Sequence, residues 1–548
     1  MSFGKTASAV SDARVAAAAA GRPVFISVIE DGPNEGIPFA VKDNIDVAGV
    51  ASTAACPAFD QPAQMSATVI ERLEAAGYVP VAKTNMDQFA TGLVGTRSPF
   101  GACASVLDPT RVSGGSSSGS AVAVASGIVP LALGTDTAGS GRVPAAFNGL
   151  VGLKPTRGLL PTRGVFPACR SLDCVTTLTR TVAEARTAFA AMAGFDPLDP
   201  SSRAAPAAPP PGIAARFETV GIPAAPVDLD PSYAVAYERS VQKARDLGLR
   251  VVTVDVSPFL EAAAMLYAGP WVAERYSAFG RFLEEDGPHL DPTVRHVVLG
   301  GRDATATAAF DAFKKLAALR RRSEGVWGHI DALLLPVVPN HPTLAEVAAD
   351  PFGTNSRLGT FTNFVNLLDL AAIAVPGVDT EAGLPFGVQF VAPAFSDHSL
   401  LDLASRWLGE NVEQPQARPA TATLALVGAH MSGLPLNHLV SARGGRLVRR
   451  ARTDSGYRMM RVPGAGVPRP GLVSGEGPAD GFGVELWELP LQALGSLAAE
   501  LSPPLRLGQL RLADGTSVLG YLGDDVALSS AEDISGYGGW RSYRESTS

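Results

Sequence analysis

The chain has 548 residues, a length that predicts two to four domains and leaves room for a large buried core. Apolar residues make up 46% of it and charged residues 18%, which excludes an intrinsically disordered chain. The formal net charge of −8 argues against a nucleic-acid-binding surface. One dense group of arginines lies within Arg443–Arg452, but Gly and Leu interrupt it, and we interpret it as an exposed strand pair.

Nothing in the sequence indicates secretion or a membrane segment. The alanine run Ala16–Ala20 follows Asp12 and Arg14 and predicts a helix of the folded protein. The longest apolar stretch, Ala121–Leu133, is broken by Gly and Pro and is too short to span a bilayer. The cysteines form no CxxC pair and no spacing typical of a metal site, so we predict buried free thiols and a cytoplasmic protein: Cys56, Cys103, Cys169 and Cys174.

From about residue 24 to residue 389, short apolar runs alternate with helical stretches. This alternation predicts an α/β domain with a central sheet. The predicted strands include Pro38–Val41, Tyr78–Ala82, Ile128–Leu133, Arg250–Val254 and Ala332–Pro336. Residues 232–247 predict a helix, with Asp230 as its candidate cap and Pro231 in its first turn.

Two Pro-rich segments predict connectors. Pro197–Pro211 predicts an exposed crossing between lobes, and Asn411–Thr423 predicts an interdomain linker after a helix at Leu400–Leu408. The sequence therefore divides into a first domain at residues 1–410, a linker at 411–423 and a second domain at 424–548.

The second domain has a different sequence pattern, in which short apolar runs alternate with turns rich in Gly, Pro and Asp. Asp514-Gly515 between two such runs predicts a hairpin. A helix is expected at Pro490–Leu501, within a domain that is otherwise mostly β.

The most unusual stretch is SGGSSSGS at residues 113–120, followed by a second Gly/Ser turn, TDTAGSG, at residues 135–141. A phosphate-binding loop needs a lysine after its glycine-rich turn, and neither turn has one. A flexible linker is disfavoured because apolar runs flank both turns. The remaining interpretation is a serine-hydrolase site, in which such turns expose a hydroxyl and direct backbone N–H groups at an oxyanion.

A serine nucleophile needs a base, and the first histidine of the chain is His289. A Ser-His-Asp arrangement would therefore depend on a distant histidine that folds back. Lysine is the alternative base when burial lowers its pKa toward neutrality. Lys42 ends an apolar run in PFAVKDNIDVAG and fits this requirement. A plain structural role for these residues is the competing interpretation.

The residues from Gly114 to Gly158, GGSSSGSAVAVASGIVPLALGTDTAGSGRVPAAFNGLVGLKPTRG, resemble the signature of the amidase family. The segment KDNIDVAG resembles that family's lysine segment, and the likeness extends over roughly residues 38–389. The resemblance implies a mixed central sheet flanked by helices and a Ser–cis-Ser–Lys triad. It assigns Lys42 as the base, Ser116 as the bridging serine and Ser140 as the nucleophile.

These residue types suit the chemistry. Neutral Lys42 would draw a proton from Ser140 through the Ser116 hydroxyl, which donates and accepts at once. The resemblance also implies an oxyanion hole made by the N–H groups of Thr137, Ala138 and Gly139.

Four charged residues near these motifs receive structural interpretations instead. Lys83 and Lys154 are predicted to anchor loops, and Asp136 and Arg142 are predicted to hold the second Gly/Ser turn in shape.

Two residues point to the substrate. Tyr267 and Arg275 are eight residues apart, so a continuous helix would place them on one face to within about 80°. Pro270 lies between them and could kink that helix. Arginine is the natural bidentate partner of a small carboxylate, and a salt bridge on the surface or between lobes is the alternative. The segment LYAGPWVAERY resembles the one with which allophanate hydrolases hold the substrate carboxylate, which implies substrate binding by both residues.

The C-terminal part resembles the extra domain of allophanate hydrolases in VGAHMSGLPLNHLV, PPLRLGQLRLADGTSVLGYL and DISGYGGWRSY. The resemblance implies a γ-glutamylcyclotransferase-like fold. It also implies that the first domain deaminates allophanate to N-carboxycarbamate and that the second promotes decarboxylation. His430 is the candidate catalytic residue there, because an imidazole near neutrality moves protons. The alternative is a packed turn with His430 hydrogen-bonded to backbone.

Taken together, the resemblance implies hydrolysis of allophanate, a small-molecule substrate. No ligand spacing in the sequence implies a metal or organic cofactor, and charge and hydropathy predict neither nucleic-acid nor membrane partners. A general amidase with a fused binding domain and a non-enzymatic protein with a dead site are the alternatives. The intact Lys42, Ser116 and Ser140 argue against the dead site. We expect a homodimer, and a pathway link to a biotin-dependent urea carboxylase or to triazine or biuret breakdown.

Overall fold

The computed structural model describes residues 7–206, 216–285, 287, 289–411, 421–441, 443, 445–463 and 466–547. The chain divides into two compact units, Met1–Val412 and Glu413–Ser548. Part of the first predicted connector, residues 207–211, and most of the second, residues 412–420, lie outside the described residues. Among the described helices, none has the length and apolar character needed to cross a membrane.

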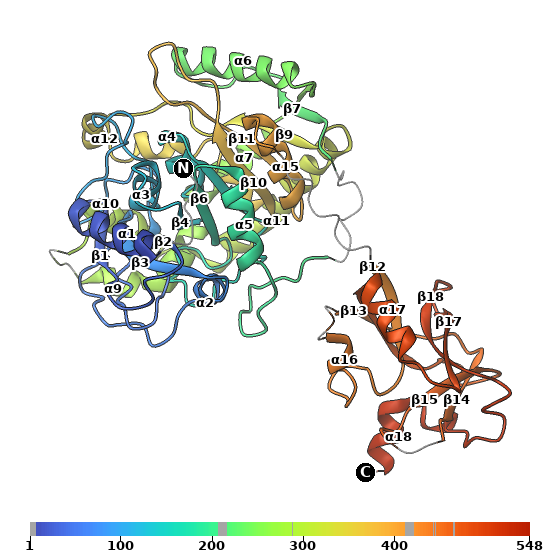
Figure 1. Ribbon diagram of the computed structural model, residues 1–548. Helices are drawn as coiled ribbons and strands as arrows, with labels where there is room; N and C mark the ends of the chain where they lie inside the picture. The colour runs from blue at the N-terminus through green and yellow to red at the C-terminus, as the bar shows by residue number, and fades with distance from the viewer. Residues whose placement is uncertain are drawn as a thin grey trace. The chain divides into compact units, whose positions relative to one another are not determined.

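The first unit is built on an eleven-stranded mixed sheet flanked by helices (Figure 1). The strand order is β1-β3-β2-β4-β6-β5-β10-β11-β9-β7-β8. Strand β2 pairs in parallel with β3 and β4, β7 pairs in parallel with β8 and β9, and the other pairs are antiparallel. The strands are β1 Phe25–Val28, β2 Ile37–Lys42, β3 Tyr78–Thr84, β4 Leu131–Asp136, β5 Val151–Lys154, β6 Cys174–Thr179, β7 Thr219–Pro223, β8 Arg250–Val254, β9 Ala332–Pro336, β10 Leu370–Pro376 and β11 Gly387–Pro393.

The five strands expected from apolar runs are present, and the α/β class is confirmed. One strand begins later than expected. Ile128 and Val129 donate their N–H groups to the carbonyl of Ala123 and so finish the preceding helix, which leaves Leu131 to start β4.

Helices pack along the sheet (Figure 1). They are α1 Ala7–Ala20, α2 Thr68–Ala75, α3 Ser118–Ala125, α4 Arg142–Phe147, α5 Val182–Met192, α6 Pro231–Asp246, α7 Ser257–Ala268, α8 Trp271–Arg275, α9 Arg281–Glu284, α10 Pro292–Leu299, α11 Ala306–Glu324, α12 Leu344–Ala349, α13 Gly353–Leu358, α14 Phe364–Leu367 and α15 Asp397–Leu408. Short helical turns are η1 Gln88–Ala90, η2 Tyr276–Gly280 and η3 Gly325–Gly328.

Two details of the helix predictions are wrong. Asp230 precedes α6, but its carboxylate does not cap the helix and instead forms an ion pair with Arg357 at 2.8 Å. Tyr267 and Arg275 do not share one helix. The extended backbone of Gly269 separates α7 from α8, and the following Pro270 has no N–H to continue the α7 hydrogen-bond ladder.

The topology brings three chain segments to one edge of the sheet. Because β2 and β4 are parallel neighbours, their carboxyl ends at Lys42 and Asp136 meet at that edge. Strand β6 runs antiparallel to β4, with Cys174 opposite Asp136, so β6 begins where β4 ends. The end of β2 holds Lys42, and the turn after β4 holds Thr137, Ala138, Gly139 and Ser140.

The second unit carries a seven-stranded sheet in the order β13-β16-β12-β18-β15-β14, with β17 paired to β18. Its strands are β12 Thr421–Leu426, β13 Arg446–Arg452, β14 Tyr457–Arg461, β15 Pro470–Ser474, β16 Gly483–Pro490, β17 Leu505–Arg511 and β18 Ser517–Gly523. Its helices are α16 His438–Ser441, α17 Leu491–Ala499, η4 Ser535–Tyr537 and α18 Trp540–Thr547. The mostly β character is confirmed, and the likeness to γ-glutamylcyclotransferase stays a prediction.

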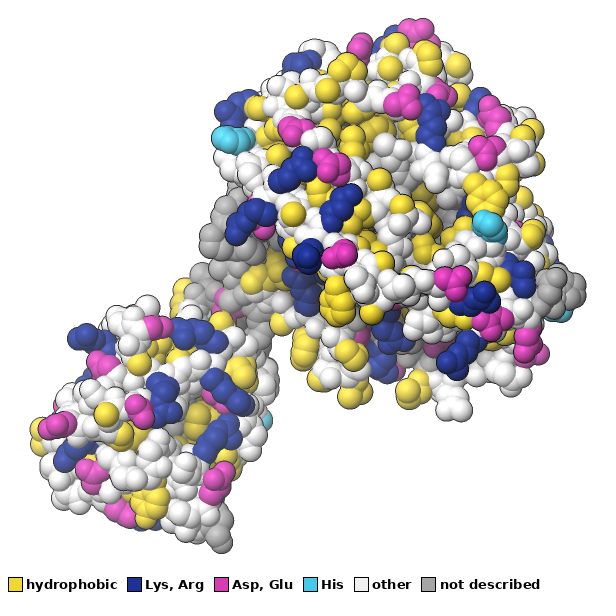
Figure 2. All heavy atoms as spheres, turned by 180° about the vertical axis from the view of Figure 1, so that it is seen from behind, with side chains coloured by type: hydrophobic (Ala, Val, Ile, Leu, Met, Phe, Trp, Pro, Cys, Tyr) yellow, Lys and Arg dark blue, Asp and Glu magenta, His cyan; other side chains and the backbone are white. Residues whose placement is uncertain are grey.

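The predicted hairpin is present, since β17 and β18 pair antiparallel around Gly515, whose φ of +83° suits glycine. The arginine group contributes one strand, β13, rather than a pair, because its partner is the distant β16. All four cysteines are buried free thiols, as predicted. Basic and acidic side chains are interspersed over the face of the molecule shown in Figure 2.

Candidate active site

Lys42 is the centre of a buried polar cluster. Its side chain is fully buried, and Nζ donates to Ser116 Oγ at 2.8 Å and to Thr135 Oγ1 at 2.7 Å. Burial lowers the pKa of Lys42 to about 7, although nearby carboxylates, Asp87 first among them, act in the opposite direction. A substantial fraction of this amine is therefore neutral at neutral pH, as a base requires.

The two Gly/Ser turns lie against each other. Ser116 follows a cis Gly115–Ser116 peptide, and Ser140 lies just before α4. The Ser117 N–H donates to the Ser140 carbonyl at 3.3 Å and joins the turns. Only glycine fits at Gly139, because its φ is +134° and a Cβ there would lie 2.4 Å from Thr362 Oγ1.

The Ser140 hydroxyl is nearly buried, with 2% of the residue exposed. Its Oγ faces the Gly92 carbonyl oxygen at 3.5 Å. Within the described part of the chain, no hydrogen bond joins the hydroxyls of Ser140 and Ser116. The predicted relay therefore requires the two hydroxyls to come within hydrogen-bond distance, and catalytic hydrogen bonds are often long in unliganded sites.

Asp136 and Arg142 hold the second turn in shape, as predicted. Both are fully buried, and the guanidinium binds the carboxylate through two nitrogens at 2.9 and 3.0 Å. The same carboxylate accepts the N–H groups of Gly139 at 2.7 Å and Gly141 at 3.3 Å.

This arrangement bears on the predicted oxyanion hole. In the unliganded site the Gly139 N–H donates to Asp136. The N–H groups of Thr137 and Ala138 have no acceptor among the residues that the structure describes. Two of the three predicted donors are thus free within the described part of the chain, and the oxyanion hole stays a prediction.

The other two buried lysines contact loops, as predicted. Lys83 donates to the Ile45 carbonyl and, at 2.8 Å, to Ser52 Oγ. Lys154 donates to the Pro155 carbonyl at 2.7 Å.

Arg275 reaches the same region from α8, with 1% of the residue exposed. Its Nη1 donates to Thr91 Oγ1 at 3.1 Å and faces the Ala90 carbonyl at 3.5 Å. Its Nη2 is buried and has no hydrogen-bond acceptor among the described residues. The ring of Tyr267 lies 5.6 Å from the guanidinium carbon, so the structure brings the two residues together across the helix break.

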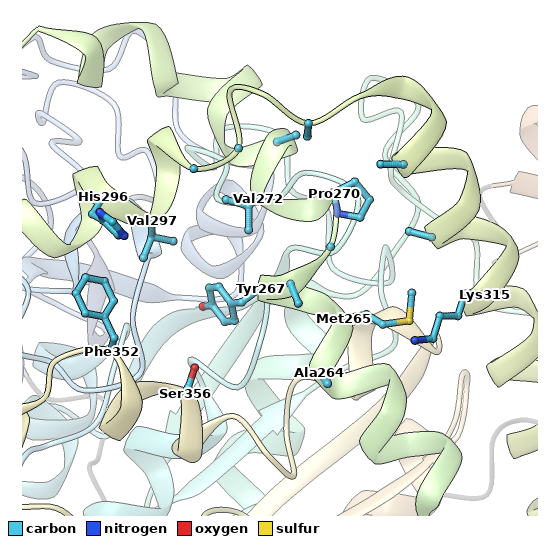
Figure 3. Close-up of a pocket in the computed structure, with 18 of the residues that line it drawn as sticks. Ala264, Met265, Tyr267, Pro270, Val272, His296, Val297, Lys315, Phe352 and Ser356 are labelled. Atoms are coloured by element: carbon cyan, nitrogen blue, oxygen red, sulfur yellow. The ribbon is translucent and has the colours of Figure 1, made fainter.

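A cavity of about 810 Å³ adjoins this pair. Tyr267 extends into it from the end of α7, with Ser356 below the ring and His296 and Phe352 beside it (Figure 3). Ser140, Ser116 and Lys42 do not line it. Tyr267 is therefore common to the open cavity and to the buried Arg275 site.

His430 lies in the second unit and does not have the predicted protonation behaviour. Burial, and then the positive charge of Arg469, lowers the pKa of His430 to about 4. The imidazole stacks on Tyr521 with ring centroids 5.1 Å apart, and the His430 carbonyl accepts from Asn437 at 2.8 Å. Because the ring is neutral at neutral pH, the argument from an imidazole that titrates near neutrality fails, and a catalytic role for His430 stays a prediction.

Residues 6–401 match the family described as Amidase, and residues 422–545 match the Allophanate hydrolase C-terminal domain. The chain belongs to the amidase family. Within this family it is 35% identical over 427 residues to a glutamyl-tRNA(Gln) amidotransferase subunit of Symbiobacterium thermophilum, covering 71% of this chain and 86% of that protein.

Two further relatives of this amidase-family chain match both of its units. Urea amidolyase of Saccharomyces cerevisiae is 38% identical over 545 residues, covering 94% of this chain but 30% of that protein. The chain thus spans about a third of the length of the urea amidolyases. The solved structure of Kluyveromyces lactis allophanate hydrolase has a TM-score of 0.68 at 38% identity, covering 96% of this chain and 93% of that one.

Sequence reasoning missed three polar residues around the amidase-family turns. Thr135 accepts from Lys42, and Asp87 accepts the N–H groups of Val94, Gly95 and Arg97 at 3.2, 3.0 and 2.9 Å. Asp173 accepts from the Thr137 hydroxyl. Thr135 stands in the same Gly/Ser turn and could have been found there, whereas the two aspartates reach the site only through tertiary structure.

Proposed function

We propose that this protein hydrolyses allophanate to ammonia and N-carboxycarbamate. The observation that carries this proposal is the buried Nη2 of Arg275, a charged donor without an acceptor among the described residues. A buried charged donor without an acceptor is costly, and a substrate carboxylate would satisfy it. The similarity to Kluyveromyces lactis allophanate hydrolase along both units supports the same substrate.

In the proposed mechanism, Ser140 is the nucleophile, Ser116 the relay and Lys42 the base. Neutral Lys42 takes the Ser116 proton across their 2.8 Å contact while Ser116 takes the proton of Ser140. The Ser140 oxygen then attacks the terminal ureido carbonyl of allophanate. The oxyanion of the tetrahedral intermediate accepts hydrogen bonds from the N–H groups of Thr137 and Ala138. One such donor typically lowers the activation barrier by about 2.7–4 kcal/mol.

The tetrahedral intermediate collapses when the carbon–nitrogen bond breaks. The proton held by Lys42 returns through Ser116 to the leaving nitrogen, which departs as ammonia. Water then attacks the acyl-enzyme by the same relay and releases N-carboxycarbamate and free Ser140. The substrate carboxylate stays on Arg275 throughout, beside the Tyr267 ring.

The second unit is assigned the later step, the decarboxylation of N-carboxycarbamate. Its match to the Allophanate hydrolase C-terminal domain supports this assignment. His430 is the candidate residue, acting as a neutral imidazole that accepts a proton or a hydrogen bond. A urea carboxylase that uses biotin is the expected supplier of substrate, and we further expect a homodimer; sedimentation of the purified protein tests the latter.

Ammonia release from allophanate by the purified full-length protein tests the proposal. Wild-type protein should release ammonia, and Ser140→Ala protein should not. Turnover of simple aliphatic or aryl amides with none of allophanate would instead select a general amidase with a fused binding domain.

A further inference from the structure

Asp173 lies at the same sheet edge as the proposed nucleophile and base. It directly precedes β6, whose first residue Cys174 is paired with Asp136 at the end of β4. Only 6% of Asp173 is exposed. None of the steps proposed above uses this buried carboxylate.

Within the described part of the chain, every hydrogen-bond partner of the Asp173 carboxylate is a donor. The Thr137 hydroxyl donates to Oδ1, the Ala168 N–H donates to Oδ2 at 2.9 Å, and the Cys169 N–H lies 3.1 Å from both oxygens. The N–H groups of Ala168 and Cys169 can only donate and so favour the ionised carboxylate, whereas the Thr137 hydroxyl can donate or accept. Burial acts in the opposite direction and raises the pKa of Asp173.

Thr137 is held from two sides. Its hydroxyl is fixed by Asp173, and its carbonyl oxygen accepts from Asn366 Nδ2 at 3.1 Å. The peptide units on either side of Thr137 carry the two free N–H groups of the oxyanion turn. Fixing the side chain and the carbonyl of Thr137 thus fixes the direction in which those N–H groups point.

The loop that supports Asp173 is also tied to α8. Glu274 accepts from the Ser171 N–H at 2.7 Å, from the Ser171 hydroxyl at 2.6 Å and from Cys169 Sγ at 2.8 Å. Arg275 is the next residue along α8. The oxyanion turn and the helix of the carboxylate-binding arginine therefore share one supporting loop.

We propose that Asp173 is a positioning residue that fixes the oxyanion turn through Thr137. The proposal needs only the amidase chemistry of Ser140. Three carboxylates act on Lys42, namely Asp87, Asp136 and Asp173, and all three favour its protonated form. Asp136 is also paired with Arg142, and Asp87 is bound to backbone N–H groups.

The negative charge of Asp173 also predicts a direction for the pH profile. Asp173→Asn removes a negative charge that favours protonated Lys42, so the pKa of Lys42 should fall. The acid limb of Ser140 reactivity should then move to lower pH. The probe is phenylmethylsulfonyl fluoride, which modifies the serine oxygen with loss of fluoride. Its rate of reaction with Ser140 is followed against pH by intact-mass spectrometry.

The positioning role is tested at Thr137. Thr137→Val removes the hydroxyl donor and should lower kcat by about tenfold or more, the effect of one charge-assisted hydrogen bond, with a smaller change in KM. Thr137→Ser keeps the donor and should recover most of the lost rate. The matched controls are Thr68→Val and Asp196→Asn, because Thr68 donates to the buried carboxylate of Asp196 at 2.6 Å in the same manner.

The outcomes are distinguishable from those for the proposed function. If the wild-type protein does not hydrolyse allophanate but its Ser140 is still labelled, allophanate is rejected as the substrate. The labelling test of Asp173 is then still valid. An acid limb that does not move in Asp173→Asn, or that moves equally in Asp196→Asn, contradicts the expected effect of the Asp173 charge on Lys42. If Thr137→Val keeps the wild-type kcat and labelling rate, or if Thr137→Ser is as slow as Thr137→Val, the positioning role is overturned, even where Asp173→Asn fails to fold.

Discussion

Replacing Arg275 tests substrate recognition most directly. In the unliganded site Nη1 is engaged by Thr91, whereas Nη2 has no acceptor among the described residues. A substrate carboxylate would therefore gain at least one charge-assisted hydrogen bond from Nη2. Such a bond contributes about 1.5–3 kcal/mol, so Arg275→Ala should lower kcat/KM for allophanate by roughly tenfold to more than a hundredfold.

The assay compares allophanate with biuret, in which a neutral amide replaces the carboxylate at nearly the same size. Ammonia release is measured for both substrates with wild type, Arg275→Ala and Arg275→Lys. The ratio of the two kcat/KM values isolates the carboxylate contact, because a general loss of activity cancels from it. Arg275→Lys should give an intermediate ratio, since lysine keeps the charge but loses the planar fork.

Equal losses on the two substrates would refute the assignment and give Arg275 a structural role. The matched control is Arg72→Ala. Arg72 also donates to backbone carbonyls, those of Met192 at 2.7 Å and Gly194 at 2.9 Å. Neither of these acceptors belongs to α8. Its replacement should leave the substrate ratio unchanged, and thermal unfolding of each variant shows whether the fold persists.

The remaining predictions concern the triad and the two units. Ser140→Ala should abolish ammonia release, and Ser116→Ala should retain a small fraction of the wild-type rate. Retention of a tenth of the wild-type rate by Ser140→Ala would contradict the mechanism. The kcat/KM profile should fall below about pH 7, because Lys42 with a pKa of about 7 gains a proton there; a profile flat to pH 5 would exclude Lys42 as base. A fragment ending near residue 412 should still release the first ammonia if it stays in solution, since the chain divides at that point. His430→Ala should leave that release intact and slow carbon dioxide release in a time course; equal slowing of both would make the second unit a structural support.

The sequence was sufficient for the parts of the site that depend on local patterns. The Gly/Ser turns and the lysine at a strand end indicated a serine-hydrolase site with Lys42 as its base, and the resemblance to the amidase family assigned Ser116 and Ser140. The structure places the Lys42 amine 2.8 Å from Ser116 Oγ. Fully buried strands such as β3 and β9 were predicted from their apolar runs. These features depend on residues close together in the chain, which is why one sequence could show them.

Other features depend on partners that are distant in the chain or on folding back of a side chain. The Gly139 N–H was assigned to the oxyanion, but the Asp136 side chain folds back and accepts it. The low pKa of His430 arises from burial and from Arg469, which lies 39 residues further along. The break at Gly269 was suspected only from the neighbouring proline. In each case the deciding contact is made by the folded structure rather than by a local motif.

The sheet topology explains how so many buried polar groups can occupy one site. Parallel β2 and β4 end together, and antiparallel β6 begins beside them, so Lys42, Asp136 and Asp173 converge without any long loop. Burial alone would drive the lysine to its neutral form, and the carboxylates counteract this, leaving its pKa near 7. A base is most effective when its pKa is close to the working pH. The balance between burial and those carboxylates therefore determines whether Lys42 can act as the base, and Asp173 is the one among them that also holds the oxyanion turn through Thr137.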